Sequence, residues 1–245
     1  MDPKQPTASI PDSSHTSGTR SVSTPGRSRL YPALHQHAAK LTTSMDDATL
    51  GHSAARSRLA EWLVSEYGKS NELHVIIVCT GNSRRSILGS SMGNLAAAHF
   101  GLESIHFHSG GTEPSAFNPR TITALREIGF QIESTGDTNP SADAESPNPI
   151  YDVRWGEGLA TSEFSKRYSD PSNPQHGFAA VMVCTEADTG CPVVHGAAVR
   201  ISMPFEDPKA FDDTQLEASR YAERRDEIGR IMLSVMRQVR QNLDG

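Results

Sequence analysis

The chain has 245 residues, of which 36% are hydrophobic and 21% charged, and its net charge is −6. This length suits one domain of ordinary size with extra segments, or two small domains. There is no long run of lysine and arginine and no apolar run of membrane-spanning length, so we expect neither nucleic-acid nor membrane binding. The N-terminus lacks the apolar core of a signal peptide, and three cysteines do not make a secreted disulfide scaffold, so we expect a cytoplasmic protein.

The chain opens with a segment that is poor in large apolar residues. Residues 1–28 are rich in Ser, Thr, Pro and Gly, and we expect a disordered tail there. Residues 30–42 predict a short helix, and residues 53–67 predict a second helix that Ser53 caps. Together these helices form an N-terminal helical extension over residues 29–70. The apolar face of the second helix consists of Leu59, Trp62, Leu63 and Tyr67.

From residue 71 to residue 245 the pattern alternates between strands and helices. We predict strands at Leu73–Val78, Ile105–His108, Ala179–Cys184 and Ala198–Met203, and helices at Ser86–Phe100, Arg120–Ile128 and Gln215–Asn242. This alternation is typical of the α/β class, here a three-layer sandwich in which helices cover both faces of a four-stranded parallel sheet. Ligands of such sheets bind at the carboxyl ends of the strands, where Cys79, Cys184 and the turn after Met203 all lie.

Residues 131–177 interrupt the alternation with prolines, polar residues and little periodicity. A loop of this length is usually functional or disordered. Aromatic residues such as Tyr151, Trp155, Phe164 and Tyr168 give it some capacity to pack. We therefore expect a partly ordered insertion, and we interpret it as a lid beside the functional site.

The stretch from Val75 to Ser86 carries the most chemical information. An apolar strand ends at Cys79, and a glycine-containing turn leads to Arg85 and the start of a helix. The backbone N–H groups of such a turn and the dipole of the helix favour a bound anion and a thiolate at the start of the loop. The planar guanidinium of Arg85 matches a tetrahedral oxyanion. These residue types indicate a cysteine nucleophile that faces a phosphate-like group.

The sequence here resembles the low-molecular-weight protein tyrosine phosphatases and the thioredoxin-coupled arsenate reductases that share their fold. The similarity begins with C-T-G-N-S-R-R-S at 79–86. It continues with H-S-G-G-T-E-P (108–114), F-N-P-R-T-I-T-A-L-R-E-I-G (117–129), V-M-V-C-T-E-A-D-T-G-C-P (181–192) and F-E-D-P (205–208). A bare C-x₅-R is a weak signal, whereas the preceding strand and the ordered downstream blocks make it strong. The resemblance covers residues 73–130 and 178–242.

The resemblance implies roles for the matching residues. Cys79 would be the nucleophile, Arg85 would stabilise the oxyanion, and Asp207 would be the general acid. Glu206 competes for the role of acid, and an Asp-Pro pair alone is more often a turn. The remaining members of the oxyanion-binding loop are Thr80, Gly81, Asn82, Ser83, Arg84 and Ser86. Asn82 and Ser86 are expected to shape this loop, and Ser86 can donate a hydrogen bond to Cys79.

Two further cysteines distinguish the branches of the family. Cys184 and Cys191 lie at a spacing similar to that of the arsenate reductases, and ordinary phosphatases of the family lack this pair. The resemblance implies a relay in which Cys79 attacks arsenate, Cys184 attacks Cys79 and releases arsenite, and Cys191 takes over the disulfide for thioredoxin. A helix over residues 184–191 would hold the pair too far apart to bridge, so this segment would have to loop out. The alternatives are an inert buried Cys184 and, much less favoured, a zinc site with His195.

The sequence departs from the family at three places. Arg84 replaces a second loop cysteine, and its charge either favours the Cys79 thiolate or points into solvent. Lys209-Ala210-Phe211 follows Asp207-Pro208 where the phosphatases carry aromatic residues, which favours a small oxyanion over an aryl phosphate. The insertion, in contrast, suits either a larger substrate or a cover for Cys191.

Three functions are compatible with these residues. We favour a thiol-dependent arsenate reductase that takes a small oxyanion, uses no cofactor or metal and is re-reduced by thioredoxin. The alternative is a low-molecular-weight phosphatase that hydrolyses phosphomonoesters through a phosphocysteine intermediate. A non-catalytic anion-binding module is the third, and the intact set of Cys79, Arg85 and Asp207 argues against it.

Overall fold

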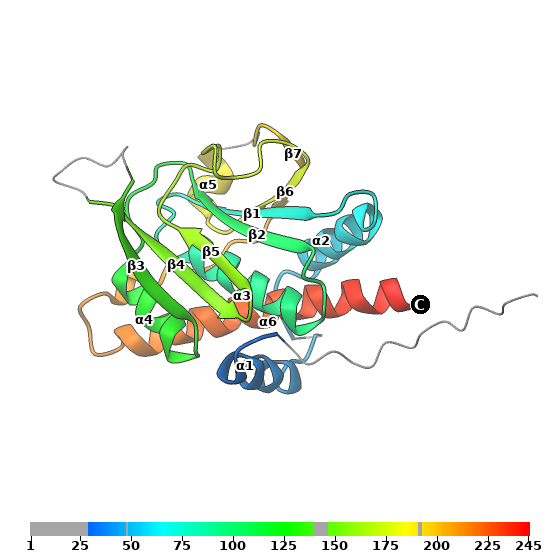
Figure 1. Ribbon diagram of the computed structural model, residues 1–245, viewed down its shortest axis with the longest axis horizontal. Coiled ribbons are helices and arrows are strands. Elements are labelled where there is room, and N and C mark those ends of the chain that lie inside the picture. The colour runs from blue at the N-terminus through cyan, green and yellow to red at the C-terminus, as the bar shows by residue number, and fades with distance from the viewer. Residues whose placement is uncertain (1–28, 48, 140–146, 191–192) are drawn as a thin grey trace, which may run out of the picture.

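The structure, a computed structural model, describes residues 29–47, 49–139, 147–190 and 193–245. The tail expected over residues 1–28 lies outside the described residues. At the centre lies a parallel sheet in the order β2-β1-β6-β7 (Figure 1). Its strands are β1 (Leu73–Cys79), β2 (Ile105–Gly111), β6 (Phe178–Met182) and β7 (Ala197–Ser202). The predicted α/β class and four-stranded parallel sheet are confirmed.

Strand β1 occupies the middle of the sheet because it is apolar on both faces. Val75 pairs with Phe107 of β2 on one side and with Ala179 of β6 on the other, and all three residues are buried. A parallel strand between two neighbours must be covered from both sides, which a continuous apolar run allows. The connections from β1 to β2 and into β6 run to opposite sides, so the strand order reverses beside β1. The carboxyl end of β1 is therefore the switch point at which such sheets bind ligands.

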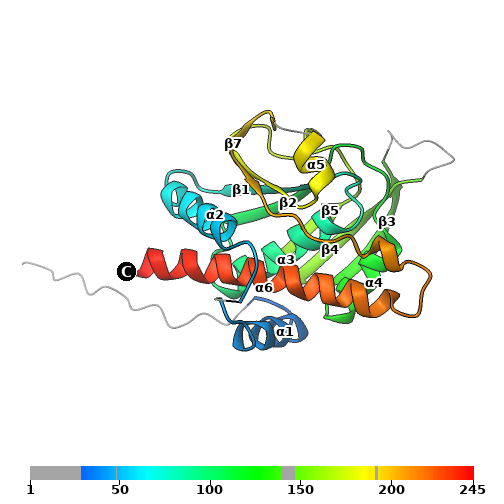
Figure 2. The same ribbon diagram turned by 180° about the vertical axis from the view of Figure 1, so that it is seen from behind.

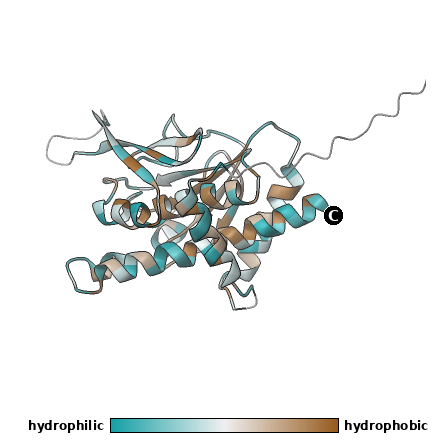
Figure 3. Cartoon of the chain, turned by 60° about the horizontal axis from the view of Figure 1, so that its bottom comes forward, coloured by the Kyte–Doolittle hydropathy of each residue, from teal (hydrophilic) through white to brown (hydrophobic). Residues whose placement is uncertain are grey.

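Two long helices cover one face of the sheet (Figure 2). Helix α3 (Arg85–His99) is buried over nearly its whole length, and α6 (Glu217–Asp244) packs against it. The approach of α3 requires glycine, because a Cβ at Gly93 would lie 2.4 Å from the ring of Phe107. In Figure 3 the apolar colour gathers over the sheet and the helices that pack on it. Apolar residues at helical spacing on α6 are buried in full: Ile228, Ile231, Met232, Val235 and Val239.

The shorter helices complete the molecule. Helices α1 (Pro32–Thr43), α2 (Ser53–Glu66) and α4 (Pro119–Glu127) all contact α6, whereas α5 (Thr185–Gly190) lies on the other side of β1 in both views (Figures 1 and 2). Asn118 caps α4, since its side chain accepts a hydrogen bond from the N–H of Arg120 at 2.9 Å. The predicted cap of α2 is wrong. His52 holds the N-cap position at a φ of 60°, without a side-chain capping bond, and Ser53 is already helical.

The insertion contains regular structure that its sequence pattern did not predict. Strands β3 (Gln131–Thr138), β4 (Pro149–Gly156) and β5 (Leu159–Glu163) form an antiparallel sheet in the order β3-β4-β5. Only a few of its side chains, among them Val153 and Trp155, join the core, so the alternation of apolar and polar residues is weak. The chain then returns to the main sheet, where Arg167 pairs with Gly111 at the end of β2.

A short 3₁₀ helix, η1 (Pro208–Phe211), follows the turn after β7 and leads towards α6. In the parts of the chain that the structure describes, no helix is both long enough and apolar enough to cross a membrane.

Candidate active site

The loop after β1, residues 79–86, forms a cradle that is open to an anion; we call it the oxyanion loop. Its carbonyl groups turn outward, so that the oxygen of Thr80 accepts from the N–H of Glu113 (2.9 Å) and that of Gly81 from the N–H of Ser115 (3.0 Å). Asn82 adopts a φ of 41°, which reverses the chain. Among the described residues, no acceptor pairs with the backbone N–H groups of residues 81–85. A ring of free N–H groups at the start of a helix is an anion-binding nest.

Cys79 lies at the base of this cradle. The residue is only 4% exposed, and its Sγ lies 3.0 Å from the hydroxyl oxygen of Ser86. Asn82 Nδ2 donates to that same hydroxyl oxygen at 2.9 Å and to Ser109 at 2.7 Å. Because the Ser86 oxygen accepts from Asn82, its own proton is free to point at the sulfur. The Ser86 hydroxyl can therefore donate a hydrogen bond to Cys79 Sγ.

Arg85 joins the oxyanion loop to the turn after β7. Its guanidinium donates to the carbonyl of Phe205 (3.0 Å) and to the carboxylate of Asp207 (2.7 Å). The third nitrogen position, Nε, is buried and has no partner in the described structure. A buried donor without an acceptor costs free energy, and an oxyanion in the cradle would supply the missing acceptor.

The structure separates the two candidate acids. Asp207 contacts Arg85 with one carboxylate oxygen and accepts from the N–H of Lys209 (3.0 Å) with the other, which caps η1. Glu206 points away: its side chain is 90% exposed and pairs with Arg224 at 3.2 Å. Asp207 is therefore the acid that meets the oxyanion loop.

The side chain of Arg84 neither points into solvent nor faces Cys79, which were the two arrangements that we expected. Its side chain is largely buried rather than in solvent, and it donates to Asp212 (2.6 Å) and to the hydroxyl of Tyr221 (2.6 Å). Tyr221 in turn donates to Asp212 at 2.7 Å. Burial and the hydrogen bond to Asp212 raise the pKa of Tyr221, whereas the hydrogen bonds from Tyr221 and Arg84 lower the pKa of Asp212 despite its burial. The charge of Arg84 is thus neutralised by Asp212 instead of being directed at the anion.

Cys184 lies beside the oxyanion loop. It follows β6, is fully buried, and its Sγ is 3.5 Å from the hydroxyl of Thr80. The N–H of Val183 donates to the carbonyl of Val78 at 2.8 Å, which extends the pairing of β1 and β6 to this point. Cys191 lies outside the described residues. The structure thus brings Cys184 close to the residue that follows Cys79.

Helix α5, which follows Cys184, is fastened to β7. Arg200 donates to the backbone oxygen (2.5 Å) and the carboxylate (2.6 Å) of Asp188, and Ser202 donates to the same carboxylate at 2.7 Å. The segment 185–190 is therefore helical and closed in this structure.

The insertion contributes residues that sequence reasoning missed. Glu163 is only 4% exposed, and it accepts from Ser109 (2.7 Å) and from Lys166 (2.9 Å). The backbone N–H of Lys166 donates to Asn82 at 2.7 Å, and the hydroxyl of Ser165 donates to the carbonyl of Gly81 at 2.9 Å. The insertion thus supports the oxyanion loop from the side, a role that differs from the lid we expected. The one available signal was the spacing of Glu163 and Lys166, which suits a local ion pair.

Comparison with known proteins agrees with this geometry. The family model described as low molecular weight phosphotyrosine protein phosphatase matches residues 74–143, which include the whole oxyanion loop. An arsenate reductase of Bacillus licheniformis is 26% identical over 156 residues, which cover 63% of this chain and 88% of the relative. An arsenate reductase of Halalkalibacterium halodurans is 27% identical, with 65% of this chain and 92% of the relative covered.

Over residues 74–143 the chain is thus similar to the low-molecular-weight protein tyrosine phosphatases, and over a longer stretch it is similar to the arsenate reductases. These similarities support an enzyme of one of these two classes. Among solved structures, a low-molecular-weight protein tyrosine phosphatase from Bacillus subtilis matches with a TM-score of 0.46 and 14% identity, covering 70% of this chain and 99% of the other. Within the described residues, no group of three His, Cys, Asp or Glu side chains is arranged to hold a metal ion.

Proposed function

We propose that this protein is a thiol-dependent arsenate reductase in which Cys79, Cys184 and Cys191 act in sequence and thioredoxin restores the thiols. One observation carries the proposal: a second buried thiol, that of Cys184, lies 3.5 Å from the side chain of Thr80, the residue next to the nucleophile. The curated relatives named above, which are called arsenate reductases, support the same choice.

The first step uses the oxyanion loop. Arsenate binds to the free N–H groups of the loop and to Arg85, whose unpaired Nε supplies a further donor. The Cys79 thiolate attacks arsenic, an As–O bond breaks, and the oxygen leaves as water after protonation. The donors already point at the place where negative charge collects, so little reorganisation is needed.

The next two steps move electrons. The thiolate of Cys184 attacks the sulfur of Cys79, the S–As bond breaks, and its electron pair reduces As(V) to As(III), which leaves as arsenite. The thiolate of Cys191 then attacks Cys184, and Cys79 leaves as a thiolate. The net change is one Cys184–Cys191 disulfide for one arsenate reduced. Thioredoxin, as the dithiol reductant, would reduce that disulfide.

The relay requires α5 to open after Cys184 has reacted. The bonds from Arg200 and Ser202 to Asp188 hold the helix closed in the reduced protein, which keeps Cys184 buried beside the loop. Formation of the first disulfide would replace the contact of Cys184 with the helix N–H of Ala187, which lies 3.4 Å from its sulfur. Opening of six helical residues is a small local change, since a helix this short has little stability of its own.

The test treats the fully reduced protein with arsenate in the absence of any reductant. Intact-mass measurement and peptide mapping should find a loss of two hydrogens, localised to a Cys184–Cys191 disulfide, with one arsenite formed per chain. Cys79→Ser should give neither product, and Cys184→Ser should stop before arsenite is released. Phosphate, which these thiols do not reduce, is the matched control ligand. Three free thiols after arsenate treatment would refute the relay.

Hydrolysis of phosphomonoesters is the second candidate, and the contact of Asp207 with Arg85 favours it. A carboxyl group at that position can protonate a leaving alkoxide and later activate water. If this activity exists, Asp207→Asn should lower kcat for an aryl phosphate by about a hundredfold or more, within the usual range for loss of an acid–base group. A phosphatase with three unreactive thiols would establish this candidate in place of the reductase.

A further inference from the structure

His52, in the N-terminal helical extension, has an unusual backbone conformation. Its φ of 60° and ψ of 32° lie in the left-handed region although it is not a glycine, and it occupies the N-cap of α2 without a side-chain capping bond. An L-residue adopts this conformation at a cost in free energy, and such strain persists only where the surrounding structure imposes it. Glycine would avoid that cost, so the imidazole is what distinguishes the residue at this position.

The loop before His52 is held by one buried arginine, Arg56 of α2. Its guanidinium donates to three backbone oxygens of that loop: those of Asp47 (2.9 Å), Leu50 (3.3 Å) and Gly51 (3.1 Å). The same guanidinium donates to the hydroxyl of Ser234 on α6 at 2.6 Å. Three carbonyl groups bound to one cation leave the loop little freedom, and the bond to α6 anchors it. The surroundings therefore impose the conformation of His52 and fix the position of its ring.

The imidazole of His52 contacts the turn after β7. Its ring centroid lies 5.1 Å from that of Phe205 and the ring planes cross at 65°, an edge-to-face contact that aromatic rings favour. The ring also forms a hydrogen bond with the backbone of Pro204, and because proline has no N–H, the imidazole is the donor. One side chain thus holds two successive residues of the turn. Phe205 is buried, which leaves its ring few other positions.

The same turn orients Arg85. The backbone oxygen of Phe205 accepts from Nη1 of Arg85 at 3.0 Å, and the carboxylate of Asp207 accepts from Nη2 at 2.7 Å. A guanidinium is planar, so these two bonds also fix the direction of Nε, the buried nitrogen that has no partner in the described structure. A displacement of Phe205 would therefore turn the group that binds the oxyanion.

We propose that His52 is a positioning residue of the oxyanion site: it holds Phe205, and through Phe205 the guanidinium of Arg85, in the orientation that binds the oxyanion. This inference rests on the oxyanion loop of the proposed function. It is independent of the cysteine relay, because the oxyanion binds before any thiol is oxidised. His52 acts on the bound anion only through Phe205.

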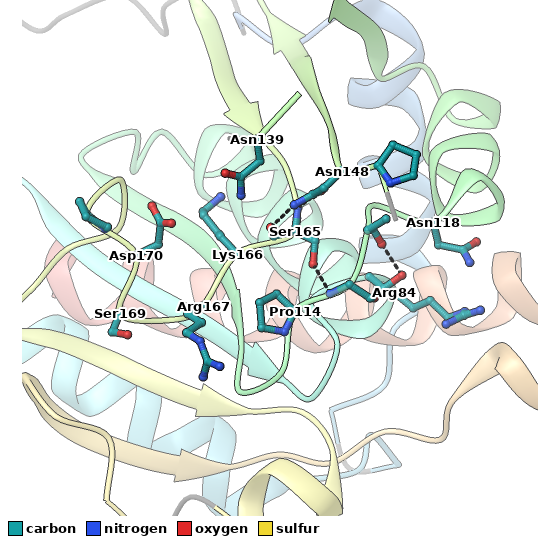
Figure 4. Close-up of a pocket in the computed structure, with 15 residues that line it drawn as sticks. Arg84, Pro114, Asn118, Asn139, Asn148, Ser165, Lys166, Arg167, Ser169 and Asp170 are labelled. Carbon is teal, nitrogen blue, oxygen red and sulfur yellow. Dashed lines mark hydrogen bonds between the residues drawn. The ribbon is translucent and has the colours of Figure 1, made fainter. Parts of the chain in front are cut away.

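Two segments outside the main sheet then support the site at different points. In the insertion, Asn148 Nδ2 donates to the backbone oxygen of Ser165 at 2.6 Å, in the wall of a polar cavity of about 970 Å³ beside the oxyanion loop (Figure 4). The hydroxyl of Ser165 donates to the outward-facing carbonyl of Gly81 at 2.9 Å. The insertion thus supports the start of the loop, and His52 supports the arginine at its end.

The experiment measures how well inorganic phosphate protects Cys79 of the fully reduced protein from iodoacetamide, with alkylation of the Cys79 peptide followed by mass spectrometry. The rate without phosphate reports the reactivity of Cys79, and the phosphate concentration that halves this rate reports the affinity for the oxyanion. His52→Asn keeps a residue that tolerates the left-handed conformation but removes the ring. The protecting concentration should rise about tenfold, because a charge-assisted hydrogen bond from Arg85 is misaligned. The rate without phosphate should not change, because the contact of Cys79 with Ser86 does not involve the turn.

His52→Gly is the second variant, because glycine relieves the backbone strain and also lacks the ring. We expect a folded protein with the same tenfold loss of phosphate affinity. His35→Asn is the matched control. It removes an imidazole of α1 that contacts His99 (5.6 Å between ring centroids), at the opposite end of α3 from Arg85, and it should leave both quantities unchanged.

Phosphate affinity that both His52 variants leave unchanged would overturn the proposal. An equal fall in Cys79 reactivity and phosphate affinity, or an equal effect of His35→Asn, would also overturn it, because either would mean a general loosening of the fold. Unfolding of both His52 variants would assign the residue to stability instead. Absence of phosphate protection in the unaltered protein would reject the oxyanion site and the proposal with it. A missing arsenate-dependent disulfide, together with the expected protection results, would reject the relay alone.

Discussion

Arg84, Asp212 and Tyr221 form a clamp between the oxyanion loop and the segment that carries Asp207. Helix η1 lies between Asp207 and Asp212. Asp207 contacts Arg85 at the start of this turn, and Asp212 contacts Arg84 at its end, so the clamp fixes the end of the turn. We predict that Arg84→Met, which keeps the length of the side chain but removes its donors, both destabilises the protein and releases this turn.

The expected loss of stability follows from the contacts. The substitution removes two hydrogen bonds of 2.6 Å, one of them to a carboxylate that is only 16% exposed. Asp212 would keep Tyr221 as a donor, and Arg120 at 3.8 Å as a distant cation. Removal of one partner from a buried charge pair costs about 3–5 kcal/mol, and the residual partners reduce this to about 2–4 kcal/mol.

Two measurements test the clamp. Urea denaturation should give the stated loss in the free energy of unfolding, and kcat for whichever substrate is turned over should fall about tenfold or more, because Asp207 and Arg85 meet less often. Arg240→Met is the control, since Arg240 makes an exposed i,i+4 pair with Asp244 at the far end of α6 that contributes less than about 1 kcal/mol.

A double-mutant cycle with Asp212→Asn isolates the pair. Coupling of about 1–3 kcal/mol is expected between contacting residues. Purely additive losses, or an Arg84 variant as stable as the Arg240 control, would refute the clamp.

Two further predictions concern pH. The hydrogen bonds from His37 (3.0 Å) and Arg225 (2.8 Å) lower the pKa of Asp226 to about 2 although burial opposes them. Since the folded pKa lies below the unfolded value, this stability is present above about pH 4 and is lost as the pH falls towards 2. Asp226→Asn should cost about 2 kcal/mol in urea denaturation at neutral pH, and an unchanged acid profile would contradict this. Burial, with the charges of His74 and other neighbours, lowers the pKa of His108 to about 3. The unfolded chain then binds the proton first, so stability falls by up to about 1.4 kcal/mol per pH unit below pH 6.5, and His108→Gln should flatten that slope in denaturation at pH 7, 6 and 5.

The main sheet and its helices were predictable because their signals are local and strong. The apolar run of β1 and the helical stripe of α6 each repeat over many residues, and both match the structure. The start of α2 was not predictable from Ser53, because a left-handed residue, His52, opens that helix without a side-chain cap. The insertion sheet was missed because only scattered residues such as Val153 are buried, which erases the period of two.

The oxyanion loop was predictable because its signal is also local: Cys79, Gly81 and Arg85 lie within one short stretch of the sequence. The partners of the loop were not. Arg84 meets Asp212 across 128 positions, and Ser109 meets Glu163 across 54. No pattern within one segment encodes such pairs, so the neutralisation of Arg84 and the support from the insertion could be found only from the structure.

The buried ion pair of Glu163 and Lys166 suggests that the insertion does more than stabilise the fold. Replacing a buried ion pair with apolar side chains is often neutral or favourable, so the pair is weak evidence of a stabilising role. Its position points to orientation instead. Glu163 accepts from Ser109, and Ser109 accepts from Asn82. The backbone of Lys166 donates to Asn82, which in turn donates to Ser86 beside Cys79.

A continuous chain of hydrogen bonds therefore links the insertion to the sulfur of Cys79. The segment that carries Glu163 and Lys166 also builds the wall of the cavity beside the loop. An insertion that only covered the site could vary without effect on the chemical step. Because this one orients Asn82, we predict that a change at Glu163 alters the reactivity of Cys79, although Glu163 lies 84 positions further along the chain.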